Sequence, residues 1–282
     1  MKIGLDIGGT EIKAGIVSNG KVIKKIAVKT QTNKGRKQVI QNITNAIKQL
    51  FNKNIKAIGV GAPGPLDYKK GILGKQVNLP LSNFNLKKYI QQKFKVPVAI
   101  DNDVNAFTLG EALYGAGKKY NNVIGLTLGT GIGGGIVINK KLYHGRGNAG
   151  ELGHITIKFD EKIRSKCNNN GCIEEYVSAR GICRRAKVKS PLELYTLAIK
   201  GNKKAISAWK QTGKLLGIGI TNITNSFDPD TIIIGGNISK AWKFFSKAMN
   251  QEINKRALLK GTKVVQTRLG ENAAIIGAAS LV

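Results

Sequence analysis

The chain has 282 residues, 41% of them hydrophobic, which is enough for one large or two ordinary domains with buried cores and excludes a disordered chain. No apolar run approaches the ~18–20 residues of a membrane span, and Met1 leads directly into a strand-like segment rather than a signal peptide, so we expect a cytoplasmic protein without membrane attachment. The net charge is +30, yet its 46 Lys and Arg residues are dispersed, which favours compositional bias over specific nucleic-acid binding.

The first half of the chain predicts a β-meander followed by alternating strands and helices. Ile3, Leu5 and Ile7 alternate as in a half-buried strand, and an Asn-Gly pair at 19–20 predicts a hairpin between the next two strands. Apolar residues then recur at helical spacing over 39–51. The remaining predictions are a strand at 55–60, a turn at 61–65, a helix at 86–94, a strand at 96–100 and a helix at 104–114.

The second half repeats this scheme and ends in a run of helices. Strands at 123–128 and 135–139 flank a Gly-rich turn, and a loop-rich section covers 142–171. The repetition of strands with helices predicts an α/β fold, with domains at 1–107 plus 267–282 and at 108–266. The other predicted elements are helices at 172–187, 191–200, 202–227, 238–255 and 271–281, and strands at 231–234 and 263–266.

Two Gly-rich turns, each directly after a strand, predict phosphate binding. Gly8-Gly9-Thr10 follows the first strand, and Gly129-Thr130-Gly131 follows the strand at 123–128. Such turns let backbone N–H groups approach phosphate oxygens without a Cβ in the way. No Gly-Lys-Ser/Thr follows the glycines, and strands rather than helices come next, so neither the P-loop nor the dinucleotide pattern applies. Gly235 and Gly236 form a third segment where the backbone could come close to a nucleotide. Together with the two turns, they favour one nucleotide held by duplicated halves over two ligand-free hairpins.

Acidic and amide residues at strand ends add the groups that phosphoryl chemistry needs. Asp6 is suited to orienting hydrated Mg²⁺, and Lys13 adds positive charge nearby. Asp101, Asn102 and Asp103 end one strand and open a helix, where a carboxylate stays ionised and can act as a general base. The alternative is that these residues only cap the helix.

The loop-rich section gathers residues that suit a metal ion or a polyol. His154, Cys167 and Cys172 are zinc-type ligands, although a closed structural zinc site takes four. Glu151 and Glu174 are carboxylates in a chain with few acids, and they suit hydrogen bonds to sugar hydroxyls. The alternative is an ordinary loop with unpaired thiols.

Taken together, these motifs resemble the ROK family of sugar kinases and related repressors, within the actin/hexokinase-like ATPase fold. The resemblance runs from Met1 to the final helix and implies two ribonuclease H-like domains, duplicated β-meander/α halves and a central cleft. The motifs that carry it are DIGGT at 6–10, GAPGPLD at 61–67, NLPLSNF at 78–84, DNDVNA at 101–106, LGTGIGGG at 128–135, GELGH at 150–154, GCIEEY at 171–176 and IIGGNIS at 233–239.

The resemblance implies an ATP- and Mg²⁺-dependent hexose kinase that acts in glycolysis as a homodimer or homotetramer. Asp103 would be the catalytic base. The sugar would bind Gly64, Asn78, Asn102, Asp103, Glu151, His154 and Glu174, and the nucleotide would bind Asp6, Gly8, Gly9, Thr10, Lys13, Gly129, Thr130, Gly131, Gly235 and Gly236.

One departure from the family pattern concerns zinc. Zinc-binding members carry Cys-x-Cys-Gly-x-x-Gly-Cys after the His, whereas here Ser165 stands in place of the first Cys and Asn168 in place of the Gly. Three ligands remain, His154, Cys167 and Cys172, and a serine hydroxyl is a poor fourth. Zinc retention therefore stays open.

Glucose is the first expected substrate, and N-acetylmannosamine, N-acetylglucosamine and fructose are the alternatives, because all offer a primary hydroxyl. A sugar-sensing regulator is the alternative of a different class. Family repressors add an N-terminal helix-turn-helix, whereas this chain begins five residues before Asp6, so we expect the kinase.

Overall fold

The computed structural model describes residues 1–76, 78–161, 163 and 167–282, and these form two compact units. Unit 1 comprises Met1–Asn121, Gly135–Ala149 and Thr267–Val282, and unit 2 comprises Asn122–Gly134 and Gly150–Gln266. The expected division after residue 107 falls inside helix α3 (Asp103–Tyr114), all of which belongs to unit 1.

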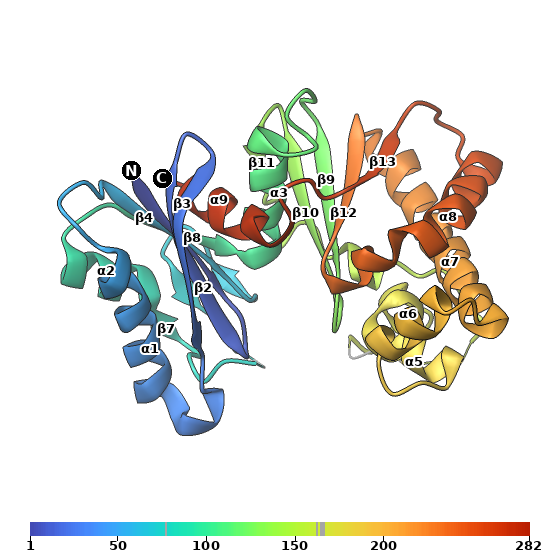
Figure 1. Ribbon diagram of the computed structural model, residues 1–282. Helices are drawn as coiled ribbons and strands as arrows, with labels where there is room; N and C mark the ends of the chain where they lie inside the picture. The colour runs from blue at the N-terminus through green and yellow to red at the C-terminus, as the bar shows by residue number, and fades with distance from the viewer. Residues whose placement is uncertain (77, 162, 164–166) are drawn as a thin grey trace. The chain divides into compact units, whose positions relative to one another are not determined.

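Two five-stranded sheets have the same strand order, which confirms the predicted duplication (Figure 1). In the first sheet, a meander of three antiparallel strands is extended by two strands parallel to the first of them. Its order is β3 (Lys21–Lys29), β2 (Glu11–Ser18), β1 (Lys2–Ile7), β4 (Ala57–Ala62) and β8 (Val98–Asn102). The order of the second is β11 (Lys141–Leu142), β10 (Ile132–Ile138), β9 (Val123–Leu128), β12 (Thr231–Gly235) and β13 (Lys263–Gln266).

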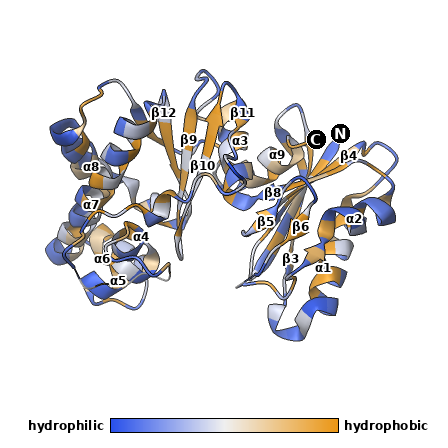
Figure 2. Cartoon of the chain, turned by 180° about the vertical axis from the view of Figure 1, so that it is seen from behind, coloured by the Kyte–Doolittle hydropathy of each residue, from blue (hydrophilic) through white to orange (hydrophobic). Residues whose placement is uncertain are grey.

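Alternation along β1 places different helices on the two faces of the first sheet. Ile3, Leu5 and Ile7 are fully buried in one core with the apolar residues of α1 (Gly35–Leu50) and α2 (Leu86–Phe94). On the other face, α9 (Ala273–Ala279) lies so close that a Cβ at Gly4 would be 1.9 Å from the carbonyl oxygen of Ile275. In Figure 2 the strands and the inner sides of these helices are largely hydrophobic.

Unit 2 contains five α-helices among its described residues. The predicted helix at 172–187 is wrong as a single element, because the chain is extended at Ser178, whose Oγ accepts a hydrogen bond from the N–H of Gly181 and caps a new helix. The helices are α4 (Glu174–Val177), α5 (Ala179–Ala186), α6 (Pro191–Ile199), α7 (Lys203–Phe227) and α8 (Trp242–Arg256).

Short elements account for the other differences from the sequence-based expectations. Strand β4 runs on to Ala62, into the predicted turn, and β10 begins at Ile132 rather than at residue 135. The predicted helices at 238–255 and 271–281 both begin with 3₁₀ turns. The additional short elements are β5 (Leu66–Asp67), β6 (Ile72–Leu73), β7 (Phe84–Asn85), and the 3₁₀ turns η1 (Thr32–Lys34), η2 (Leu152–His154), η3 (Asn237–Ala241) and η4 (Gly270–Asn272).

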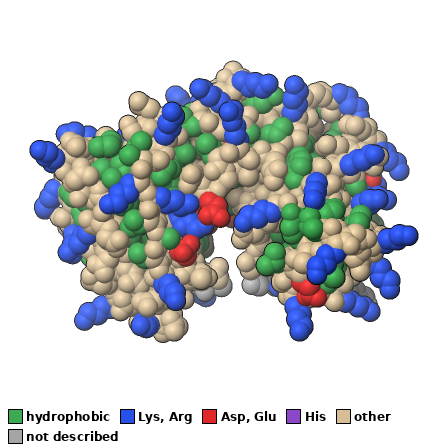
Figure 3. Space-filling model, in the orientation of Figure 1, with side chains coloured by type: hydrophobic (Ala, Val, Ile, Leu, Met, Phe, Trp, Pro, Cys, Tyr) green, Lys and Arg blue, Asp and Glu red, His purple; other side chains and the backbone are tan. Residues whose placement is uncertain are grey.

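The surface in Figure 3 carries Lys and Arg side chains over the whole displayed face rather than in one stripe. Among the described residues, no helix is long and apolar enough to cross a membrane.

Candidate active site

The first Gly-rich turn is a tight connection between β1 and β2 in unit 1. The N–H of Gly8 donates to the carbonyl of Glu11 at 2.9 Å, and the hydroxyl of Thr30 donates to the carbonyl of Gly8 at 2.7 Å. Asn78 lies beside this turn, since a Cβ at Gly9 would be 3.4 Å from its carbonyl oxygen. The backbone of the turn is therefore fixed, and the turn lies beside Asn78, which is predicted to bind the sugar.

The predicted group of acidic and amide residues at 101–103 lies where β8 ends and α3 begins. Asn102 caps α3, because its Oδ1 accepts from the N–H groups of Val104 at 2.8 Å and Asn105 at 3.2 Å. Its Nδ2 lies near Gly64, where a Cβ would be 3.5 Å away. With the oxygen of the side chain occupied by the helix, the amide group of Asn102 is the part suited to donating to a sugar oxygen.

The carboxylates of Asp6 and Asp103 in unit 1 interact electrostatically. Burial, and after it the negative charge of Asp103, raise the pKa of Asp6 to about 6 against the opposing charges of Lys13 and Lys25. A divalent cation bound here would relieve the unfavourable environment of a half-buried carboxylate beside a second one. Lys13 lies 3.3 Å from Glu271 and 4.0 Å from Glu11, so its ammonium group is partly neutralised by acids of the protein.

The second Gly-rich turn joins β9 to β10 in unit 2 and is closed by a carboxylate. The N–H of Gly129 donates to the carbonyl of Gly131 at 3.0 Å. Glu174, the first residue of α4, accepts from the N–H of Ile132 at 2.8 Å, and a Cβ at Gly131 would be 2.5 Å from its Oε2. A side chain at position 131 would therefore displace this carboxylate, which is predicted to bind the sugar, from the turn.

A cavity of roughly 470 Å³ in unit 2 begins at the same turn. Gly236 directly precedes Asn237, one of the lining residues. The φ of Gly236 is 81°, and a Cβ there would lie 2.3 Å from the carbonyl oxygen of Leu128, so this position requires glycine. The apolar and aromatic lining suits a nucleoside whose phosphates extend toward Gly129 and Thr130. Its lining residues are Gly129, Thr130, Ala179, Ser190, Pro191, Leu192, Tyr195, Trp209, Asn237, Ile238, Lys240 and Ala241.

Sequence reasoning missed most of this lining. Leu192 and Tyr195 come from α6 and Trp209 from α7, and these helices carry no motif. The one sequence signal for the cavity was the Gly235-Gly236 pair, which directly precedes the lining residues Asn237 and Ile238. This pair lies at the end of β12, and β12 is the neighbour of β9 in the sheet.

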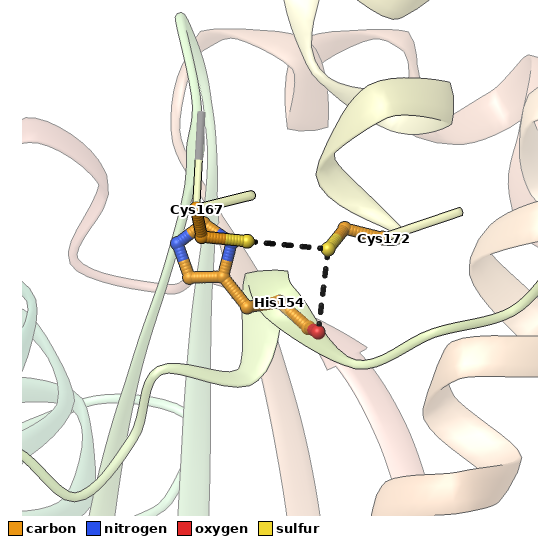
Figure 4. A group of neighbouring side chains, drawn as sticks. All are labelled: His154, Cys167 and Cys172. Carbon is orange, nitrogen blue, oxygen red and sulfur yellow. Dashed lines mark hydrogen bonds between the residues drawn. The ribbon is translucent and has the colours of Figure 1, made fainter. Parts of the chain in front are cut away.

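The loop-rich section brings the predicted zinc ligands together (Figure 4). The ligand atoms of His154, Cys167 and Cys172 all lie within 4.8 Å of one another, and the two Sγ atoms are 3.5 Å apart. Zinc–sulfur bonds of ~2.3 Å in a tetrahedron separate two sulfurs by about 3.8 Å, so the geometry fits zinc. His154 Nδ1 is buried and has no hydrogen-bond partner among the described residues, which also fits a metal ion. Ser165 lies outside the described residues.

Glu151, a carboxylate predicted to bind the sugar, lies next to this cluster and is exposed to solvent. The 3₁₀ turn η2 places Glu151 and His154 on one side, with Glu151 Oε2 3.8 Å from His154 Nε2. The Glu151 side chain is 70% exposed, so it is available for hydrogen bonds to a ligand.

Each unit thus gathers one part of the predicted set. Within unit 1, Asp6 and Asp103 interact, Gly9 borders Asn78, and Gly64 borders Asn102. Unit 2 holds the second turn, Gly235 and Gly236, and the group Glu151, His154, Cys167, Cys172 and Glu174.

Residues 2–282 match the model of the ROK family. The chain belongs to the ROK family. It is 33% identical to a glucokinase of Halalkalibacterium halodurans, over 99% of this chain and 94% of that protein. It is also 31% identical to a xylose repressor of Caldicellulosiruptor bescii, over 99% of this chain and 77% of the repressor.

The fold of this ROK protein also matches a solved structure. A ROK glucokinase from Streptomyces griseus, crystallised with glucose and AMPPNP, superposes with a TM-score of 0.87 at 29% identity, over 100% of this chain and 98% of that one. The predicted α/β class and the actin/hexokinase-like architecture are thereby confirmed.

Proposed function

We propose that this ROK protein is an ATP-dependent hexose kinase that transfers the γ-phosphoryl group of ATP to the 6-hydroxyl of a hexose. The observation that carries the proposal is the nucleoside-sized cavity that begins at Gly129 and Thr130, a Gly-rich turn suited to phosphates. The carboxylate of Asp103 at the end of β8 supplies the second requirement, a general base.

In the proposed reaction, Asp103 accepts the proton of the sugar 6-hydroxyl as that oxygen attacks the γ-phosphorus. The new P–O bond forms as the bond to the β-phosphate oxygen breaks, and ADP leaves. Backbone N–H groups of both Gly-rich turns bind the phosphates. Asp6 would hold hydrated Mg²⁺, which when bound supplies positive charge that offsets the charge on the phosphoryl oxygens.

The sugar would be oriented by the amide of Asn102 and the carboxylates of Glu151 and Glu174. Fixing the 6-hydroxyl in line with the phosphorus accounts for a large part of the rate in such reactions. His154, Cys167 and Cys172 would hold zinc, which would support the segment that carries Glu151 and leads to Glu174. The zinc has no part in the chemical step.

Glucose is the proposed substrate, and this is supported by the glucokinase relatives. N-acetylmannosamine, N-acetylglucosamine and fructose offer the same primary hydroxyl. A panel of these sugars with ATP, Mg²⁺ and coupled detection of ADP tests the proposal. We expect glucose to give the highest kcat/KM, and release of ADP that no sugar accelerates would contradict it.

A sugar-sensing regulator is the second candidate, supported by the xylose repressor relative and the net charge of +30. It predicts DNA binding that is sequence-specific, persists at physiological salt and changes with a sugar, because charge alone gives only non-specific affinity. A gel-shift selection with random duplexes tests it. The kinase proposal predicts only weak binding without sequence preference.

A further inference from the structure

His144 lies in the segment after β11, and its side chain contacts two other segments of unit 1. Its Nε2 is 2.7 Å from Oδ2 of Asp101, which is almost fully buried. Its ring stacks on that of Tyr68, with 3.8 Å between centroids and 6° between planes. It is one of two histidines in the chain, and the sequence motifs gave it no role.

The contact with Asp101 bears on the residues that follow it. Oδ1 of Asp101 accepts from the backbone N–H of Asn102 at 2.7 Å and from Nδ2 of Asn105 at 2.8 Å. Because an ionised carboxylate only accepts, Nε2 of His144 donates to Oδ2. Asp101 therefore has partners on both oxygens, and its orientation fixes the backbone at Asn102, directly before Asp103.

The other contacts of His144 reach the two neighbouring loops. Tyr68 follows β5, four residues after Gly64. The backbone carbonyl of His144 accepts from the N–H groups of Gly147 at 2.7 Å and Ala149 at 3.1 Å, which closes the loop that leads to Glu151. His144 thus joins three segments, and each carries or leads to a predicted sugar ligand.

We propose that His144 is a positioning residue for the hexose, which orients Asn102 and Asp103 through Asp101 and holds the loop after Gly64 through Tyr68. This inference rests on the proposed kinase function. It differs from a purely stabilising role, because His144 has only 16% of its side chain exposed yet belongs to a polar contact rather than to the apolar core of α1 and α2.

Three substitutions separate the two contacts. His144→Gln keeps a donor that can reach Asp101 but loses the ring, whereas His144→Phe keeps the ring on Tyr68 but loses the donor; His144→Ala loses both. Small displacements of reacting groups cost up to ~100-fold in rate. We expect His144→Phe and His144→Ala to lower kcat/KM for the hexose by roughly 10- to 100-fold, and His144→Gln to recover most of it.

The nucleotide constants provide the readout that a merely structural role would not give. The cavity residues and the second Gly-rich turn belong to unit 2, and the first Gly-rich turn is held by hydrogen bonds of Gly8 with Glu11 and Thr30 rather than with His144. KM for ATP should therefore stay within about twofold in all three variants. Glu252→Gln, which breaks an ion pair with Arg256 on α8, is the control and should match the wild type in all constants.

The outcomes distinguish this inference from the kinase proposal. A wild-type protein that phosphorylates no sugar in the panel overturns the kinase proposal and the inference with it. An active wild type with His144→Phe equal to it in kcat/KM for the hexose overturns the inference alone. So does a parallel loss for hexose and ATP that His144→Gln does not recover.

Discussion

Asp6 of unit 1 lies where its charged form is disfavoured, which costs stability when the carboxylate is ionised. Asp6 carries a carboxylate whose pKa is raised to about 6, first by burial and then by the charge of Asp103. The DIGGT motif predicted the presence of an acid here, and the strand end at 101–103 predicted a second. Their mutual influence depends on β1 and β8 lying on either side of β4, which residue identities alone do not give.

Asp6→Asn should therefore stabilise the protein in the absence of Mg²⁺. The folded pKa of about 6 exceeds the ordinary value of 3.8, so the native state binds the proton more tightly. The contribution of Asp6 to the free energy of unfolding is fully present below pH 3.8 and is lost as pH rises through about 6. We expect the variant to be more stable by about 1–3 kcal/mol near pH 8, with the difference vanishing near pH 4.

Urea unfolding of both proteins in chelator at the two pH values measures this difference. The same variant should lose sugar phosphorylation, because the proposed ligand of hydrated Mg²⁺ is gone. Equal or lower stability of the variant near pH 8 would contradict the role given to burial.

His154 and the two cysteines make a second residue-scale prediction. Because the geometry fits zinc, the purified protein should contain the metal, and a strong chelator should lower its melting temperature by several degrees. Cys172→Ser should bind no zinc, whereas Cys183→Ser should bind it normally. Metal analysis and the charge-transfer band of a cobalt-substituted protein are the measurements. A metal-free protein whose melting the chelator leaves unchanged would refute the site.

At the scale of elements, periodicity located strands and helices well but did not show where a helix is interrupted. Val123–Leu128, Leu86–Phe94 and Lys263–Gln266 have the predicted bounds. The break at Ser178 was missed because apolar residues on both sides continue a helical pattern, while the capping bond forms only in the folded chain. The cavity lining was unpredictable for a related reason, since α6 and α7 contribute side chains that no local pattern connects.

Close packing of α9 is an element-scale feature that substitution can test. A Cβ at Gly277 would lie 1.6 Å from the carbonyl oxygen of Ala106 in α3. This clash is with backbone atoms, so relieving it requires α3 or α9 to move. Overpacking costs about 1–3 kcal/mol and occasionally more, so we expect Gly277→Ala to lower the free energy of unfolding by at least that amount.

Ser280→Ala, near the end of the same helix, removes only a hydrogen bond to the carbonyl of Ile276 and should cost about 1 kcal/mol or less. Chemical denaturation of both variants compares them. Equal stability of the two would show that α3 and α9 are not packed through this glycine.

For the whole molecule, the repeated strand order is the feature that the sequence predicted most completely. Two Gly-rich turns after corresponding strands indicated the duplication, and the strand orders confirm it. The net charge of +30 is a property of the same scale. It was no guide to the fold, but a field of this sign attracts anions from a distance.

That field predicts a salt dependence that differs between the two substrates. Screening shortens the Debye length from ~10 Å at 0.1 M salt to ~3 Å at 1 M, so KM for ATP should rise several-fold over this range. KM for an uncharged hexose should change little. Steady-state kinetics at several chloride concentrations, with free Mg²⁺ held constant, gives both values. Equal salt effects on ATP and hexose would argue against steering of the nucleotide.

In the proposed reaction, Asp103 activates the 6-hydroxyl of a hexose toward ATP. Nuclear magnetic resonance of ³¹P and ¹³C during incubation with ATP, Mg²⁺ and glucose tests it most directly, for the wild type and for Asp103→Asn. We expect hexose 6-phosphate and ADP in equal amounts with the wild type, and no product with Asp103→Asn, which should still bind glucose. Phosphorylation at another hydroxyl, or near-normal product formation by Asp103→Asn, would contradict it.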